Sequence, residues 1–114
     1  MSMFSAIKNV YHSAKVGWHH GKAGKYLRRG DCQSALKHYL LAYEYSRSSE
    51  DVGGQAVELE CIARTHFRLN DFVQARQYAE KSLAIYQKFQ TKGKSDLFSE
   101  SVSRVEQLLV RLQT

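Results

Sequence analysis

Residues 23–35 read AGKYLRRGDCQSA, and residues 63–75 read ARTHFRLNDFVQA. The two segments repeat one pattern, with an alanine at each end and a Gly-Asp or Asn-Asp pair between them. Glycine and asparagine tolerate the left-handed conformation that ends a helix, and the aspartate that follows can cap the next helix. Each segment therefore predicts the end of one helix, a tight turn and the start of a second helix.

The rest of the chain has the composition of an all-α protein. Proline is absent, and good helix formers such as Ala, Leu, Lys, Glu and Gln occur throughout. Apolar residues recur at the spacing of one helix face, for example Val102, Val105 and Leu109 near the C-terminus. Polar, glycine-containing loops are expected at 48–54 and 91–96. We expect helices near 3–29, 32–48, 54–69, 72–90 and 96–113.

This pattern resembles the tetratricopeptide repeat, a pair of antiparallel helices that pack closely through small residues. Ala23 and Ala63 would be the small residues of the first helix in each unit, and we expect both to be buried. Trp18 stands one residue early for the family pattern, and the spacing of the units is longer than usual. The resemblance implies one domain over 1–114: an extension at 1–15, repeats at 16–49 and 50–90, and a capping helix at 95–114.

The resemblance also implies where a partner would bind. Stacked helix hairpins form a concave face lined by the first helix of each unit. Most charged residues expected on that face are basic, and arginine is suited to contacts with carboxylates. We therefore expect a protein-binding scaffold that holds an acidic peptide or helix of another protein. The expected groove residues are His20, Gly24, Arg28, Glu60, Arg64 and Arg68.

The N-terminal segment offers an alternative interface. The net charge of +6 comes entirely from residues 1–30, which hold six lysines and arginines and no acidic residue. An apolar stripe follows the same segment at spacings of three and four residues. It could pack onto the repeats or a second copy in a homo-oligomer, or lie on an anionic membrane surface with help from Lys8 and Lys15. The stripe consists of Phe4, Ile7, Tyr11, Ala14 and Trp18.

No pattern in the sequence indicates an enzyme, a metal site or a cofactor. The chain lacks HExxH and Cys-x-x-Cys motifs, and a glycine-rich phosphate loop is absent as well. Cys32 and Cys61 are expected to be buried or half-buried thiols in a reducing compartment. Glu58 and Glu60 flank one residue of a helix, so their side chains should point to different faces. His66 is expected to pack between helices.

Nucleic acid is a less favoured partner, although the isoelectric point is about 9.4. The basic excess is confined to one end, and the aromatic residues, including Phe67 and Phe72, are expected in the core and not on an exposed platform. No segment approaches the roughly 20 apolar residues of a membrane span. The N-terminus also lacks the pattern of a secretory signal. We therefore expect residence in the cytoplasm.

Overall fold

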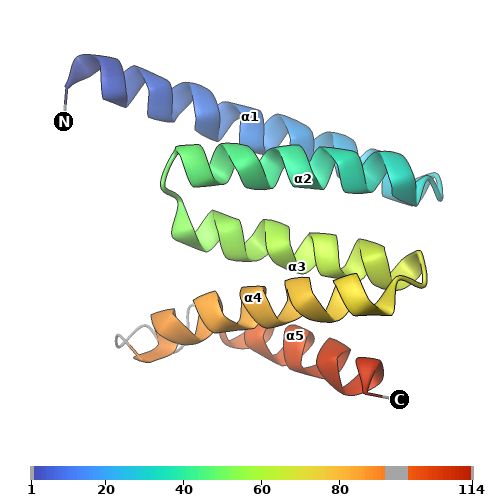
Figure 1. Ribbon diagram of the computed structural model, residues 1–114. Helices are drawn as coiled ribbons and strands as arrows, with labels where there is room; N and C mark the ends of the chain where they lie inside the picture. Colours follow the sequence, from blue (N-terminus) through green and yellow to red (C-terminus); the bar gives the residue numbers. More distant parts are fainter. Residues whose placement is uncertain (1, 92–97, 114) are drawn as a thin grey trace.

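The computed structural model describes residues 2–91 and 98–113, and within these ranges the chain forms five α-helices. Each helix packs against the next one along the chain, so that neighbours run antiparallel (Figure 1). The predicted all-α class is confirmed. The helices are α1 (Met3–Arg28), α2 (Cys32–Ser48), α3 (Val52–Arg68), α4 (Phe72–Thr91) and α5 (Ser99–Leu112).

The two predicted Gly-Asp and Asn-Asp turns are confirmed. Gly30 and Asn70 adopt the left-handed conformation, with φ of 79° and 62°. The carboxylate of Asp31 accepts a hydrogen bond from the backbone N–H of Ser34 at 3.0 Å, and Asp71 accepts in the same way from Gln74. These caps fix the starts of α2 and α4, because they satisfy backbone donors that have no partner inside the helix.

The turn between α2 and α3 is shorter than the loop predicted at 48–54. Asp51 accepts a hydrogen bond from the N–H of Gly54 at 2.9 Å, so that α3 begins at Val52. Glu50 adopts the left-handed conformation that closes this turn. The second predicted loop, 91–96, lies outside the described residues except for Thr91, the last residue of α4. The start of α5 is at Ser99, three residues later than predicted.

Small residues allow the helices to approach closely. Ala23 and Ala63 are fully buried, as predicted, and so are Ala35 and Ala75 on the helices opposite them. A first apolar cluster joins α1, α2 and α3 around Ala23, Ala35, Tyr39 and Ile62. A second cluster joins α3 and α4 to the apolar face of α5, including Val105 and Leu108. The predicted capping helix therefore covers the outer side of the α3–α4 pair.

One predicted core position is wrong. Phe72 is 48% exposed, because it is the first residue of α4 and its ring contacts Phe67 only at the edge of the core, at 5.4 Å between centroids. Of the three arrangements left open for the apolar stripe of α1, burial against the repeats is not observed, because Phe4, Ile7 and Trp18 are exposed. The helix contacts α2 through a different face, where histidines and tyrosines stack.

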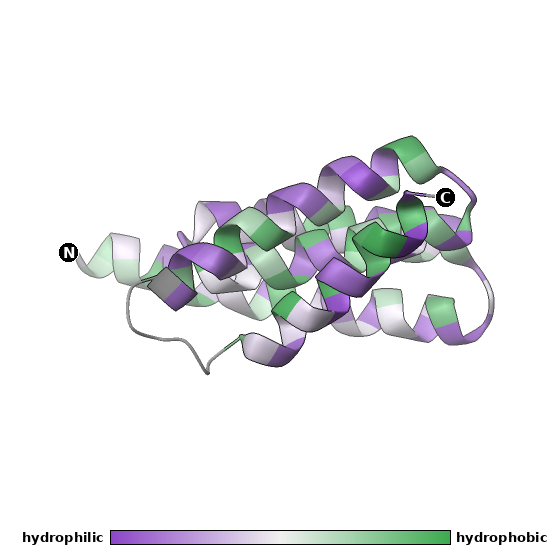
Figure 2. Cartoon of the chain, turned by 90° about the horizontal axis from the view of Figure 1, so that it is seen from below, coloured by the Kyte–Doolittle hydropathy of each residue, from purple (hydrophilic) through white to green (hydrophobic). Residues whose placement is uncertain are grey.

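Polar and apolar residues alternate along the helices (Figure 2). Among the described residues, no helix has the combination of length and apolar character that crossing a bilayer requires.

Candidate functional site

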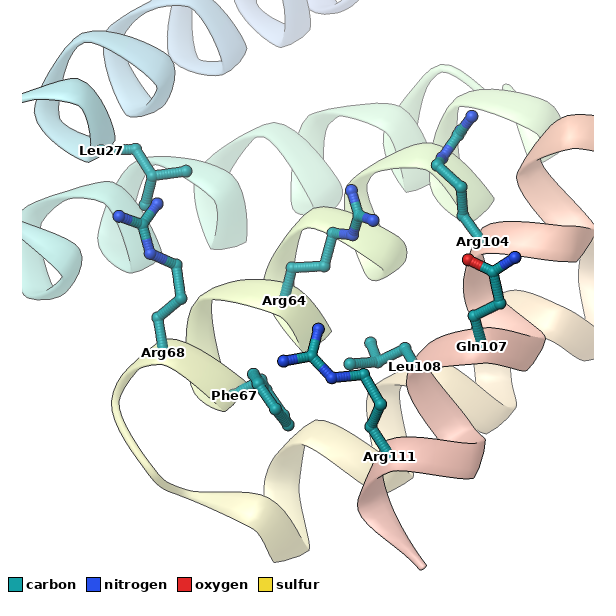
Figure 3. Close-up of a pocket in the computed structure, with 8 residues that line it drawn as sticks. All are labelled: Leu27, Arg64, Phe67, Arg68, Arg104, Gln107, Leu108 and Arg111. Atoms are coloured by element: carbon teal, nitrogen blue, oxygen red, sulfur yellow. The ribbon is translucent and has the colours of Figure 1, made fainter.

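A pocket of about 410 Å³ lies between the C-terminal ends of α1 and α3 and the face of α5 that turns toward them (Figure 3). Four arginines surround it, and apolar side chains form part of its wall. The residues that line this arginine pocket are Leu27, Arg64, Phe67, Arg68, Arg104, Gln107, Leu108 and Arg111.

Helix geometry brings the four arginines together. Arg64 and Arg68 are four residues apart on α3, and Arg104 and Arg111 are seven apart on α5, so each pair lies on one helix face. In the close-up view, Arg111 reaches from α5 toward Phe67 of α3 (Figure 3). Arg68 extends in the same view toward Leu27 of α1. The packing of α5 against α3 and α4 therefore concentrates positive charge that is widely separated in the sequence.

A buried carboxylate ties α5 to this position. Glu60 accepts hydrogen bonds from Arg104 Nε at 2.9 Å and Nη2 at 3.3 Å, and from the hydroxyl of Tyr86 at 3.0 Å. The hydrogen bond to Glu60 raises the pKa of Arg104, and burial raises the pKa of Tyr86. Arg64 Nε also lies 3.8 Å from the carboxylate.

The predicted role of Glu60 as a groove residue needs correction. Its side chain is buried, and it does not line the arginine pocket. Buried charges require partners, and Arg104 and Tyr86 provide them. Glu60 therefore orients Arg104 and offsets part of the positive charge of the arginine pocket. Because Glu60 is buried outside the pocket lining, a bound partner would not contact it.

The wall of the arginine pocket combines charge with apolar surface. The guanidinium of Arg111 lies over the ring of Phe67, 4.7 Å from its centroid. Leu27 and Leu108 border the same space. Such a surface suits a ligand that carries negative groups beside aliphatic or aromatic ones, because guanidinium groups both pair with carboxylates and stack on aromatic rings.

A second, more open hollow of about 760 Å³ adjoins the arginine pocket and shares Leu27 and Arg68 with it. His20, Gly24 and Arg28 line this hollow. Arg64 lines the arginine pocket, and Arg68 lines both hollows. Five of the six predicted groove residues therefore lie around these two adjoining hollows, and Glu60 is the exception. Arg64 and Arg68 are exposed.

A cluster of potential metal ligands lies at the edge of the second hollow. His20 Nδ1 is 2.9 Å and 3.1 Å from the two carboxylate oxygens of Glu58, and the ligand atoms of His20, Glu58 and Cys61 lie within 4.8 Å of one another. These atoms are of the kinds that bind Zn²⁺. The hydrogen bond that His20 donates to Glu58 raises the pKa of His20, and burial raises the pKa of the Cys61 thiol to about 12.

The protonated thiol and the imidazole–carboxylate pair make this cluster a polar contact between α1 and α3. Tyr39, whose own pKa is raised to about 12 by burial, lies beside Cys61. Glu58 faces α1 while Glu60 faces α5, so the prediction that the two carboxylates point to different faces is confirmed.

Sequence reasoning missed the contribution of α5. Helix spacing places Arg104 and Arg111 on faces other than the apolar stripe, and neither was predicted as a groove residue. Their spacing of seven residues was a usable signal, because it places both arginines on one face beside Leu108. What the sequence did not reveal is that this face turns toward Arg64 and Arg68.

Comparisons of the chain with protein-family models, with curated protein sequences and with solved structures found no match. The fold and the pocket define an all-α protein of sequentially packed antiparallel helices with a cationic cavity beside α3.

Proposed function

We propose that this chain is a tetratricopeptide-like protein-interaction module whose arginine pocket holds an acidic segment of a partner protein. The observation that carries the proposal is the convergence of four arginines from two helices on one cavity with apolar walls.

Equivalent positions in the two hairpins support the repeat interpretation. Residues 40 apart in the sequence share their structural roles: Ala23 and Ala63 are buried in the first helix of each hairpin, and Gly30 and Asn70 close the turns with positive φ. Ala35 and Ala75 are likewise buried in the second helix of each hairpin. Local geometry that recurs at a fixed spacing is what a helical-repeat architecture would produce, and it supports this part of the proposal.

The chemistry of the pocket favours a carboxylate ligand. Each guanidinium offers donors in a planar fork that can pair with both oxygens of a carboxylate. The arginine pocket holds four guanidinium groups, and the carboxylate beside them, Glu60, is already paired. A surface with one dominant charge accelerates the encounter with an oppositely charged partner. Leu27, Phe67 and Leu108 would contact apolar side chains of the same segment.

A binding role is better supported than catalysis. Burial raises the pKa of the Cys61 thiol to about 12, so that it stays protonated near neutral pH, whereas a nucleophilic cysteine is a thiolate. Arg104 is committed to Glu60. The remaining groups of the pocket are suited to recognising charge, not to transferring protons.

A direct binding titration tests the proposal. The probe is a fluorescein-labelled peptide of about 15 residues in which Glu and Leu alternate in blocks, and the readout is fluorescence anisotropy. We expect the double variant Arg64→Gln with Arg68→Gln to bind this peptide at least about tenfold more weakly. The matched control is Lys37→Gln with Lys81→Gln, which removes the same charge from exposed positions on α2 and α4 and should leave binding nearly unchanged.

Two further probes separate the ligand classes. A peptide with Lys in place of Glu should not bind, and single-stranded RNA of similar charge should bind more weakly than the acidic peptide. If the double arginine variant and the double lysine control lose the same affinity for the acidic peptide, net charge and not the arginine pocket governs binding. If the RNA binds more tightly than the acidic peptide, the ligand class of the arginine pocket is nucleic acid and not protein.

A further inference from the structure

The outward face of the first half of α1 is apolar and exposed. Phe4 is 81% exposed and Trp18 is 54% exposed. At about 100° per residue, the large apolar side chains of this segment fall within roughly a third of the helix circumference. This outward face consists of Met3, Phe4, Ile7, Val10, Tyr11 and Trp18.

The opposite side of the same helix is already occupied. His19 and Ala23 are buried against α2, and His12 stacks on Tyr45 of α2 at 5.4 Å between ring centroids. The N-terminal turns of α1 extend past the end of α2 (Figure 1), and they are coloured as largely apolar in Figure 2. An exposed apolar surface of this size on one helix marks an interaction site.

Lysines border the outward face. The ammonium of Lys15 lies 5.6 Å from the ring centroid of Tyr11 and 5.8 Å from that of Trp18, and Lys22 lies 5.6 Å from the Trp18 ring. Residues 1–30 contain no aspartate or glutamate. A second copy of α1 would therefore oppose lysines with lysines, whereas an anionic surface would complement the lysines and the apolar side chains together.

We propose that the outward face of α1 binds the surface of an anionic lipid bilayer, with the helix lying parallel to the membrane plane. Phe4 and Ile7 would enter the boundary between headgroups and acyl chains, and Lys8 and Lys15 would contact anionic headgroups. Trp18 and Tyr11 have the ring chemistry that favours the membrane–water interface. This surface lies on a different side of α1 from Leu27, His20 and Gly24, so the arginine pocket and the second hollow stay open to a protein partner.

The single tryptophan of the chain, Trp18, reports on this binding directly. The full-length protein is titrated with vesicles of phosphatidylcholine alone and of phosphatidylcholine with 30% phosphatidylserine, and tryptophan emission and co-sedimentation are recorded. We expect a blue shift and sedimentation with the anionic vesicles, and much weaker effects with the neutral ones. Raising the salt concentration should reduce binding.

Variants at the exposed face identify the binding surface. Phe4→Gln with Ile7→Gln should weaken partitioning at least about tenfold, since full burial of either side chain is alone worth about that factor. The matched control, Val73→Gln with Val110→Gln, removes exposed apolar side chains from α4 and α5 and should bind as the parent does. Circular dichroism checks that both variants keep their helicity.

Three results would overturn this inference. Equal partitioning of the two double variants would remove the outward face of α1 as the site. Equal binding to neutral vesicles would remove the role of the lysines. A dimer in light scattering that Phe4→Gln with Ile7→Gln dissociates, without any change of Trp18 emission on vesicles, would assign the face to a second copy.

Discussion

Replacement of Arg104 by methionine is the sharpest test of how the arginine pocket is built. The side chain of Arg104 donates two hydrogen bonds to the buried carboxylate of Glu60. Methionine retains much of the aliphatic stem but offers no donor. The variant therefore leaves Glu60 with Tyr86 at 3.0 Å and with Arg64, whose Nε is 3.8 Å away.

The expected cost follows from the exposure of the two partners. Removing one partner of a fully buried ion pair costs about 3–5 kcal/mol, and a hydrogen bond to a charged group contributes about 1.5–3 kcal/mol. The side chain of Arg104 is 42% exposed, so solvent screens its charge and the loss of stability should lie near the lower end of these values. We expect the free energy of unfolding to fall by about 2 kcal/mol, and the melting temperature by about 8 °C for a chain of this size.

Urea denaturation followed by circular dichroism measures this effect in a double-mutant cycle with Glu60→Gln. The two single changes should cost more in sum than the double variant, with a coupling of about 1 kcal/mol. Arg29→Met, at an exposed position after α1, is the control and should change stability by less than about 0.5 kcal/mol. A cost for Arg104→Met no larger than the control, or strict additivity in the cycle, would refute the proposed anchoring of α5.

Three further predictions concern the core and its titratable groups. Ala63→Leu should cost about 1–3 kcal/mol in the free energy of unfolding measured with urea, because Ala63 is fully buried and the added atoms overpack the contact; an unchanged transition midpoint would contradict this packing. Burial, and then the charge of His38, holds the pKa of His19 below 6.5, and burial with nearby lysines lowers that of His38. At these two histidines the unfolded chain binds protons first, so their contribution to the free energy of unfolding should fall as pH drops below 6.5, and the fall measured with urea should be smaller in His38→Gln. The Cys61 thiol, with a pKa of about 12, should react with iodoacetamide at pH 8 only after unfolding, as peptide mass spectrometry would show; rapid labelling in the native state would contradict its burial.

Much of the fold could be predicted because it depends on local signals. The conformations of Gly30 and Asn70 and the capping by Asp31 require only neighbouring residues, so the sequence specifies them directly. Helix spacing also predicted the apolar face of α5, where Val105 is buried. Phe72 was misjudged because its hydrophobicity resembles that of a core residue, whereas its place at the very start of α4 leaves the ring half outside.

The candidate site was predicted only in part, since it depends on how distant helices meet. The basic character of α3 near Arg64 and Arg68 was readable in the sequence. The burial of Glu60 was not, because it results from contacts with Tyr86 and Arg104, which are 26 and 44 residues away along the chain. The same holds for His20 and Glu58, which are 38 residues apart. Tertiary contacts of this kind leave no periodic pattern in the sequence.

The central claim, that the arginine pocket binds an acidic protein segment, is tested most directly by nuclear magnetic resonance of the arginine side chains. The Nε–H signals of the ¹⁵N-labelled protein are followed during titration with the block Glu–Leu peptide. We predict that Arg64, Arg68 and Arg111 shift together along one saturating curve, while Arg29 and Arg47, on other surfaces of the molecule, do not shift. Shifts spread evenly over all arginines, or confined to the residues of α1, would contradict the assignment of this pocket as the binding site.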